Sequence, residues 1–366
     1  MLVLTTWYPS AERPGETPFV PRHVRAAARH HDVRVLHVRL LRTGPVLLER
    51  WDGIPVLRLP FHPLHPAGVL RAYREVLRHL AGADLLHTTP FSAALVALPL
   101  AGRRPWVHTE HWNGVLTPEQ NGPLWRRLAG LRRILRVPDR VTGVSSVMCD
   151  VLGRFAPAQK VERIGNVVEH DRDVSPPPRG PVLELVAVGA LRPLKDPLLA
   201  VDTVAWLRSA GHDVRLTWCG AGELEQEVRD RVREHGLEDH VLLPGPVSSE
   251  EVRARLAAAD AFLLPSRSET FCVAAAEALA AGRPVVMGAV GGQRDFVHPG
   301  NGRLVAGRTP EAFGRAVLEV VSAPGMLGPR EMAEEIRSRY GADRIAGELD
   351  RLYRSVAQPP ARGPRL

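Results

Sequence analysis

Two short segments of the chain carry residue types that could hold a phosphorylated ligand. The first, residues 266–277, follows an apolar run and leads into a helical pattern. Such a turn exposes the first amides of the helix, here those of Cys272 and Val273, and free amides at a helix N-terminus attract anions. Glu269 and Glu277, with seven residues between them, would flank this site and accept hydrogen bonds from hydroxyl groups. The structural alternative is that Glu269 caps the helix and Glu277 lies on the surface.

The second segment places two cations directly after another strand-like run. Arg192 and Lys195 both follow residues 183–188, at the end where parallel strands present their ligands. Two cations there could clamp a diphosphate. Lys195 is one of only two lysines among 48 basic residues, which marks a position where an ammonium is preferred to a guanidinium. The alternative is a solvated loop with Asp196 as a helix cap.

The elements that must position these segments alternate between strand and helix patterns. Short apolar runs are typical of buried strands, and the stretches between them have helical periodicity. This alternation predicts an α/β fold with two doubly wound, Rossmann-like domains that face each other across a cleft. The predicted strands cover residues 33–38, 54–59, 84–88, 106–109, 140–145, 183–188, 213–218, 241–243, 261–264 and 285–287. The predicted helices cover residues 18–30, 67–80, 91–98, 123–137, 146–155, 197–209, 223–235, 249–258 and 272–281.

A proline-rich stretch predicts the boundary between the two domains. Residues 173–181 contain three consecutive prolines, which can neither continue a helix nor pair within a central strand. We predict a hinge there, between an N-terminal domain at residues 1–172 and a C-terminal domain at 182–341. Residues 342–366 are predicted to form a helix that crosses back to the first domain and then a frayed tail.

Composition excludes several classes of protein. The 366 residues are 45% hydrophobic, which is typical of globular domains and not of disordered chains. Three distant cysteines cannot form a disulfide scaffold and fit a reduced cytoplasm, and no apolar run is long enough to span a membrane. Residues 1–7 lack the basic start of a signal peptide and are predicted to form the first strand. The net charge of +8 comes from arginines spread along the chain, which indicates a diffusely basic protein and no nucleic-acid partner.

One segment concentrates this basic charge. Residues 124–136 contain five arginines, and leucines recur at 124, 128, 131 and 135 with helical spacing. We expect a helix that packs its leucine stripe on the first sheet and leaves a basic face in solvent. The alternative is a peripheral contact of Leu124–Arg136 with the anionic inner face of the cell membrane, next to a lipid-linked acceptor.

The two phosphate-binding segments together resemble the family 4 retaining glycosyltransferases of the GT-B fold. Glu269 and Glu277 match the E-x7-E motif of that family, and the segment Gly189–Lys195 is similar to its G-R-x-x-x-x-K loop. Further similarity lies in Asp139–Ser145, Ile164–Val168, Trp218–Gly222, Leu243–Val247, Ala259–Ser266 and Gly291–Asp295. The resemblance spans nearly the whole chain and is densest in the second domain.

The resemblance implies transfer of a hexose-type sugar from a nucleoside-diphosphate sugar, with retention of configuration and no metal. A UDP-sugar is the expected donor, ahead of a GDP-sugar. Arg192 and Lys195 would hold the diphosphate with the amides of Cys272 and Val273, Glu269 would contact the sugar, and Glu277 would contact the ribose. The donor-binding residues implied are Gly15, Thr270, Phe271, Cys272, Val273 and Glu277, with Glu269, Arg192, Lys195 and His111 as catalytic residues.

In the first domain the resemblance implies acceptor binding. Gly15 would pass its backbone close to the phosphate, and His111 would lie beside the sugar. Two residues depart from the family pattern, because Cys272 stands where glycine is usual and Asp295 stands where glutamate is usual. A polysaccharide, a lipid-linked glycan and a small metabolite all remain open as acceptors. The rival interpretations are a nucleotide-sugar epimerase or a phosphorylase of the same architecture, and a basic protein that binds nucleic acid or a membrane surface.

Overall fold

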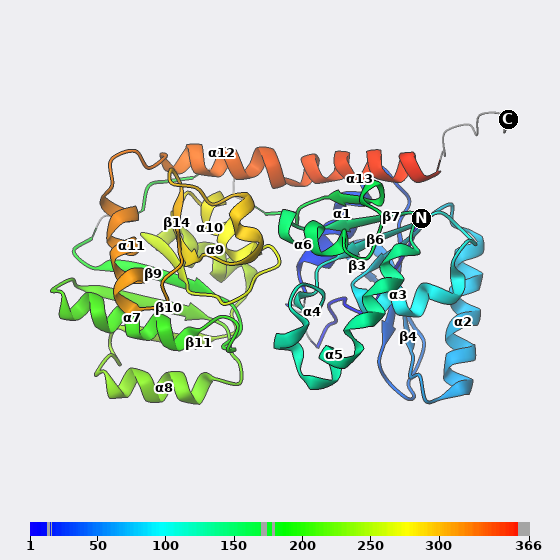
Figure 1. Ribbon diagram of the computed structural model, residues 1–366, viewed down its shortest axis with the longest axis horizontal. Coiled ribbons are helices and arrows are strands. Elements are labelled where there is room, and N and C mark those ends of the chain that lie inside the picture. Colours follow the sequence, from blue (N-terminus) through cyan, green and yellow to red (C-terminus); the bar gives the residue numbers. More distant parts are fainter. Residues whose placement is uncertain (13–14, 16, 170–173, 178–179, 358–366) are drawn as a thin grey trace. The chain divides into compact units, whose positions relative to one another are not determined.

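The computed structural model describes the chain except residues 13–14, 16, 170–173, 178–179 and 358–366 (Figure 1). Its contacts divide the chain into two compact units, Met1–Val167 with Ala342–Leu366, and Val168–Gly341. Residues 173, 178 and 179 of the expected hinge and the expected frayed tail at 358–366 lie outside the described residues.

The first unit contains a sheet of eight strands in the order β3-β4-β2-β1-β5-β6-β7-β8. Every neighbouring pair is parallel except β3 and β4, which form an antiparallel pair at one edge. Neither β3 nor β8 was predicted, because both edge strands carry half-exposed or exposed residues and lack an apolar run. The strands are β1 (Leu2–Thr5), β2 (Arg34–Arg39), β3 (Leu47–Trp51), β4 (Ile54–Pro60), β5 (Leu86–Thr89), β6 (Trp106–Glu110), β7 (Arg140–Gly143) and β8 (Val161–Arg163).

Helices cover both faces of this sheet, so its central strands are apolar on both sides. Leu2 and Leu4 of β1 point into one core, while Val3 points into the other. The helix α13 (Ala342–Ala357) contributes Leu349 and Leu352 to the core that contains Val3, so this helix is part of the first unit. The other helices are α1 (Phe19–Ala27), α2 (Pro66–Ala81), α3 (Phe91–Ala97), α4 (Asn113–Leu116), α5 (Pro123–Leu128) and α6 (Ser146–Leu152), with short 3-10 turns between them.

The second unit contains six parallel strands in the order β11-β10-β9-β12-β13-β14. Counted within the unit this is the order 3-2-1-4-5-6, which is typical of nucleotide-binding sheets. The strand order reverses between β9 and β12, and ligands of such sheets bind at that switch point. The strands are β9 (Leu183–Val188), β10 (Val214–Cys219), β11 (Val241–Gly245), β12 (Ala261–Leu264), β13 (Val285–Gly288) and β14 (Gly302–Val305).

The second unit is also covered by helices on both faces of its sheet. They are α7 (Pro197–Ser209), α8 (Glu225–Glu234), α9 (Ser249–Ala258), α10 (Val273–Ala280), α11 (Pro310–Ser322) and α12 (Pro329–Tyr340). Each unit is thus a doubly wound domain with a mainly parallel sheet, and the predicted α/β class with two Rossmann-like domains is confirmed. Within the described residues, no helix combines the length and the apolar character needed to cross a membrane.

The expected burial of the leucine stripe in residues 124–136 is wrong. The α-helix α5 ends at Leu128, and the chain continues as the 3-10 helix η3 (Ala129–Arg136), which contains Gly130. Leu124, Leu128 and Leu131 are 70%, 42% and 40% exposed, and of the four leucines only Leu135 is buried. The face that packs on the unit is set by Trp125, whose Nε1 donates to the Gly114 carbonyl and whose ring lies 4.7 Å from that of Trp112.

Candidate active site

The loops after β9 and β12 meet at the switch point of the second sheet. The Lys195 Nζ donates to Glu269 Oε1 over 2.7 Å, and the Ser266 hydroxyl donates to the same oxygen over 2.6 Å. The amide of Arg267 donates to the carbonyl of Leu194, so the two loops are also joined through their backbones. The two segments identified in the sequence, around Lys195 and around Glu269, therefore lie side by side at the carboxyl ends of β9 and β12.

The charge of Lys195 is stabilised by this contact. Burial alone would lower the pKa of Lys195, but the carboxylate of Glu269 outweighs burial and raises it. The ammonium group therefore stays protonated at neutral pH. It provides a fixed positive charge beside the point where the sheet would receive a ligand.

The helix α10 begins beside this ion pair with an open N-terminus. Cys272 is its N-cap residue and has a φ of +68°, in the left-handed region that normally favours glycine. The buried Cys272 thiol makes no capping hydrogen bond to the helix, and burial raises its pKa, so it stays neutral. The amides of the first turn, from Val273 onward, are consequently available to an anion.

Arg192 and Asp196 have opposite surroundings in the loop after β9. The Arg192 side chain is exposed and makes no polar contact within the described part of the chain. Asp196 is the N-cap residue of α7, but its carboxylate makes no capping hydrogen bond and is paired instead with Arg267 at 2.8 Å and with Arg308. Asp196 therefore caps the helix by its position and not through its side chain, and within the described residues the loop presents one engaged cation, Lys195, and one cation without a partner, Arg192.

Glycines allow the loops to pack backbone against backbone at this edge. A Cβ on Gly291 would lie 2.0 Å from the carbonyl oxygen of Glu269, and Gly291 has a φ of +74°. The amide of Gly292 donates to the same carbonyl over 3.0 Å. On the other side, a Cβ on Gly220 would lie 2.1 Å from the carbonyl oxygen of Gly189. These close approaches fix the positions of the loops that carry Glu269 and Lys195.

The side chain of Phe271 packs into the core of the second unit and does not face the site. Its ring lies 5.2 Å from Phe296 and 5.0 Å from Tyr340 in the core of the second unit. Only the backbone of Phe271 can therefore reach a ligand. Thr270, Val273 and Glu277 are half-buried, and Glu277 lies one turn into α10.

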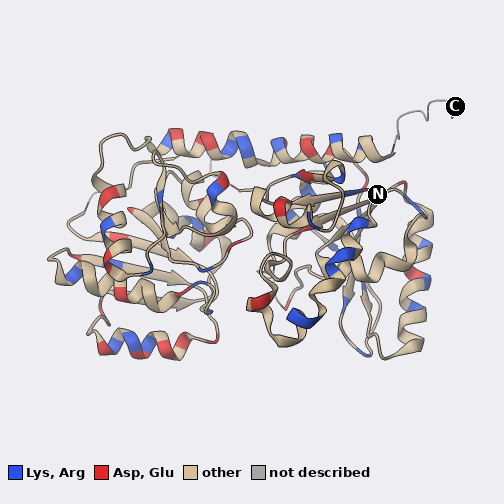
Figure 2. Ribbon diagram, viewed as in Figure 1, with Lys and Arg blue, Asp and Glu red and all other residues tan. Residues whose placement is uncertain are grey.

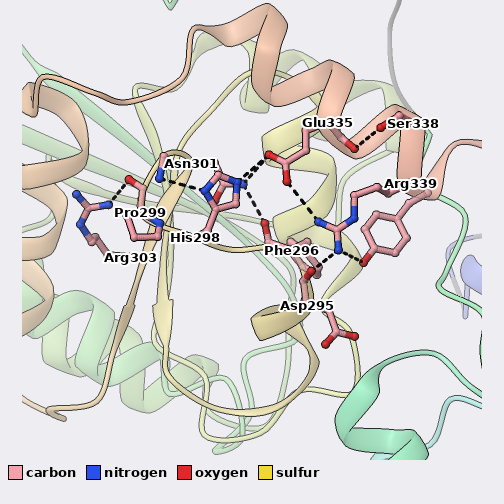
Figure 3. Close-up of polar contacts among 11 residues, drawn as sticks. Asp295, Phe296, His298, Pro299, Asn301, Arg303, Glu335, Ser338 and Arg339 are labelled. Atoms are coloured by element: carbon pink, nitrogen blue, oxygen red, sulfur yellow. Dashed lines mark hydrogen bonds and ion pairs between the residues drawn. The ribbon is translucent and has the colours of Figure 1, made fainter.

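A polar network ties the turn after β13 to α12 (Figure 3). Arg339 donates to the carbonyl of Asp295, while Glu335 accepts from His298 Nε2 over 2.8 Å and from Arg339 Nη1 over 3.3 Å. Figure 3 shows the Asp295 carboxylate pointing away from this network. Asp295 therefore contributes through its carbonyl to holding the glycine turn that packs on Glu269.

The first unit contains the two remaining predicted residues. His111 follows β6 and is buried, with its ring 4.9 Å from Phe19 and 5.2 Å from His23. Burial, with a smaller effect of nearby histidines, lowers the pKa of His111 well below its usual range, and neither ring nitrogen has a partner at hydrogen-bonding distance among the described residues. Gly15 lies in an exposed turn where an added Cβ would meet nothing within 4 Å.

Comparison with known proteins shows the family of the chain. Residues 171–339 match the family Glycosyl transferases group 1, and residues 20–172 match Glycosyltransferase Family 4. A D-inositol 3-phosphate glycosyltransferase of Frankia alni is 31% identical, over 87% of this chain and 88% of its own. The chain belongs to the family of group 1 glycosyltransferases. A relative of the same name from Corynebacterium urealyticum is 32% identical, over 86% of this chain and 81% of its own.

Two solved structures share the fold of this glycosyltransferase. Sucrose-phosphate synthase of Thermosynechococcus elongatus has a TM-score of 0.80 and 21% identity, over 97% of this chain and 98% of that one. HepE of Anabaena, solved in complex with UDP and glucose, has a TM-score of 0.78 and 18% identity, over 97% and 99%. The predicted GT-B fold class is confirmed by this similarity.

Sequence reasoning missed two contributors to the site of this glycosyltransferase. Ser266 carries the second hydrogen bond to Glu269, and Arg308 pairs with Asp196 across 112 residues. Ser266 could have been suspected from its place at the end of β12, whereas nothing near Arg308 in the sequence indicates its partner. Among the residues that the structure describes, no three His, Cys, Asp or Glu side chains are grouped as metal ligands.

Proposed function

We propose that this glycosyltransferase moves a hexose-type sugar from a nucleoside-diphosphate sugar to a hydroxyl acceptor, with retention of configuration and without a metal. The observation that carries the proposal is the Lys195–Glu269 pair at the switch point, next to the open N-terminus of α10. Exposed Arg192 supplies a second cation on the same loop. Cations and helix amides together can neutralise a leaving diphosphate.

In the proposed reaction, the bond between the anomeric carbon and the diphosphate oxygen breaks, and a bond to the acceptor oxygen forms on the same face. The acceptor proton passes to the departing phosphate oxygen. Lys195, Arg192 and the amides of Cys272 and Val273 stabilise the charge that develops on the diphosphate. Glu269 is already engaged by Lys195 and Ser266, which suits it to hold sugar hydroxyls in place and not to attack the sugar. Glu277 takes the ribose hydroxyls.

We propose a UDP-sugar as the first donor to test, ahead of a GDP-sugar. HepE, which shares the fold, is solved with UDP and glucose.

Two relatives are named for D-inositol 3-phosphate, which makes this cyclitol phosphate the first acceptor to test. We place the acceptor on the first unit, near residues 9–19 and His111–Asn113. We also propose a cytoplasmic location, because reduced thiols such as those of Cys219 and Cys272 persist there.

The test begins with thermal unfolding in the presence of nucleoside diphosphates and their sugars, with a chelator present. A ligand at 100 times its Kd stabilises the folded protein by about 2.7 kcal/mol. One nucleotide should stabilise the wild-type protein, while Lys195→Ala and Glu277→Ala should lose that response. Arg229→Ala, on the distant surface of α8, is the control that should keep it. Absence of any nucleotide response would overturn the proposal.

Product analysis then separates transfer from the rival reactions of the same architecture. A new glycoside with the donor's anomeric configuration, detected by NMR, is the expected product. Isomerised donor would indicate an epimerase, and a sugar phosphate formed from a glycoside and inorganic phosphate would indicate a phosphorylase.

A further inference from the structure

The surface formed by residues 123–136 combines exposed leucines with exposed arginines. Leu124, Leu128 and Leu131 recur at helical spacing and are 70%, 42% and 40% exposed. Three exposed leucines within eight residues give this segment an apolar character that is of interest where it coincides with unpaired charge. We refer to Leu124, Arg126, Arg127, Leu128, Leu131, Arg133 and Arg136 as the basic–leucine surface.

Within the described part of the chain, the arginines of this surface form no ion pair with an acidic side chain. Residues 123–136 contain five arginines and no aspartate or glutamate, which gives a local charge of +5. The exposed side chains of Arg126, Arg127, Arg133 and Arg136 form no ion pair or hydrogen bond with any residue that the structure describes. Figure 2 shows basic residues along α5, in contrast to the mixed charges of α8.

The surface arginines of α8, in contrast, form ion pairs with acidic side chains. Arg229 pairs with Glu225 and Arg231 pairs with Asp202, each at 2.8 Å, and Arg233 pairs with Asp230. A solvated basic face that only served solubility would be expected to mix charges in this way. The uncompensated charge of the basic–leucine surface therefore calls for an anionic partner.

The segment cannot turn its leucines inward, because its other face is already fixed. Trp125 Nε1 donates to the Gly114 carbonyl over 2.6 Å, and Arg132 Nη1 donates to the Val115 carbonyl over 3.0 Å. The Arg132 guanidinium also lies 4.6 Å from the centre of the Phe155 ring, and Leu135 is fully buried. These contacts on the opposite face hold the segment in the orientation that exposes the leucines.

We propose that the basic–leucine surface docks this glycosyltransferase onto an anionic phospholipid membrane. Leucines can enter the acyl boundary while the flanking arginines contact lipid phosphates, which is the pattern of interfacial helices. A nucleic acid would satisfy the arginines but not the leucines, and a second copy docked by the same surface would bring two +5 segments together. The surface lies next to the region where we place the acceptor, since Trp125 packs on Trp112, but the proposal does not depend on the donor site.

The test is co-sedimentation of the full chain with vesicles of phosphatidylcholine containing about 30% phosphatidylglycerol, a composition chosen for its negative surface charge. We expect binding to these vesicles, weaker binding as salt is raised, and little binding to pure phosphatidylcholine. The variant Leu124→Ser/Leu128→Ser/Leu131→Ser and the variant Arg126→Gln/Arg127→Gln should each weaken binding on the order of tenfold.

Matched controls keep the test specific. Leu242→Ser removes a leucine that is 42% exposed, as Leu128 is, and Arg229→Gln/Arg315→Gln removes the same charge from the second unit. Both controls should bind vesicles like the wild-type protein. Equal binding by wild type and leucine variants, equal binding to neutral vesicles, or binding to duplex DNA that ignores the leucines would each overturn the proposal. Nucleotide-dependent thermal stabilisation, measured on the same variants, should remain unchanged and reports separately on the donor site.

Discussion

Lys195 and Glu269, 74 residues apart in the chain, are joined by a hydrogen bond of 2.7 Å across the switch point of the second sheet. Glu269 is buried, and its remaining side-chain contact at the same oxygen is the hydroxyl of Ser266. The pair thus holds the loop after β9 against the loop after β12. A change in either residue alters both the charge at the site and the position of the other loop.

Substitution of Lys195 is expected to destabilise the second unit as well as to abolish nucleotide binding. Lys195→Ala leaves a buried carboxylate without its cation, which costs about 3–5 kcal/mol. Lys195→Ala/Glu269→Gln should recover part of that loss, because no unpaired charge remains. Urea unfolding, with hydrogen exchange at β9 and β12 as the local readout, measures both effects.

The contribution of Lys195 to the free energy of unfolding depends on pH in a predictable direction. The folded-state pKa of Lys195 is raised, so its contribution is fully present below the unfolded value of about 10.4 and is lost only as pH rises through the folded pKa. The stability difference between wild type and Lys195→Ala should therefore be constant from about pH 6 to about pH 9. A difference that vanished within that range would contradict the ion pair.

Arg192→Ala is expected to separate binding from stability. The exposed guanidinium makes no polar contact within the described residues, so its removal should change the free energy of unfolding by less than about 0.5 kcal/mol. If Arg192 clamps the diphosphate, kcat/KM for the donor should fall by about a hundredfold, with Arg192→Lys in between. A stability loss with normal kinetics would assign Arg192 to the fold and not to the reaction.

Gly291→Ala is expected to distort the site because the added Cβ would meet the Glu269 carbonyl at 2.0 Å, with a φ of +74°. A backbone atom cannot rotate away, so we expect a loss of several kcal/mol and loss of nucleotide response. Gly236→Ala is the matched control, since its φ is +63° and nothing lies within 4 Å. That control should cost only about 1–2 kcal/mol, from the left-handed conformation alone, and should keep the nucleotide response. Equal effects of the two substitutions would contradict the close approach.

Cys272 is expected to tolerate glycine and to reject a β-branched residue. At a φ of +68°, Cys272→Gly relieves backbone strain while losing the small buried thiol, so stability should change by about 1 kcal/mol or less. Cys272→Val places a branched side chain in the left-handed region beside the Lys195–Glu269 pair and should destabilise by more than about 2 kcal/mol. Chemical denaturation of the two variants, alongside nucleotide binding, decides this.

The sequence indicated that the candidate residues lie at one edge of the sheet, but it did not indicate the contacts between them. Arg192, Lys195 and Glu269 all follow strongly apolar strands, so their meeting at one sheet edge follows from parallel βαβ topology. The ion pair between Lys195 and Glu269 depends on loop conformation, and the left-handed backbone of Cys272 breaks the rule that such positions prefer glycine. Neither could be derived from residue spacing.

Failures in predicting the fold have similar causes. β14 carries only partly buried residues after Gly302, so its pairing with β13 leaves no apolar signal. Helical spacing identified the leucines of residues 124–136 correctly, but periodicity does not say whether a stripe faces the core or the outside. The orientation of the stripe is set by Trp125, which packs on Trp112, 13 residues away in the chain.

Acid is expected to open the first unit before the second. Burial lowers the pKa of His23 and of His37 to about 4 and that of His87 to about 3, and all three lie in the first unit. The unfolded chain takes up protons below about pH 6.5 while these folded histidines do not, so stability falls as pH drops from 6.5 toward 4. At pH 5 each contributes a loss of about 2 kcal/mol.

Hydrogen exchange measured near neutral pH and near pH 5, corrected for the intrinsic rate, should show β1 and β5 losing protection while β9 and β10 keep theirs. His87→Gln should reduce the pH sensitivity of the first unit, because it removes a group that burial, with a smaller effect of His23 and His108, keeps neutral. His235→Gln, on an exposed ring that pairs with Asp202 in the second unit, should leave that sensitivity unchanged. Simultaneous opening of both units in acid would mean that the buried histidines do not set the acid limit of the fold.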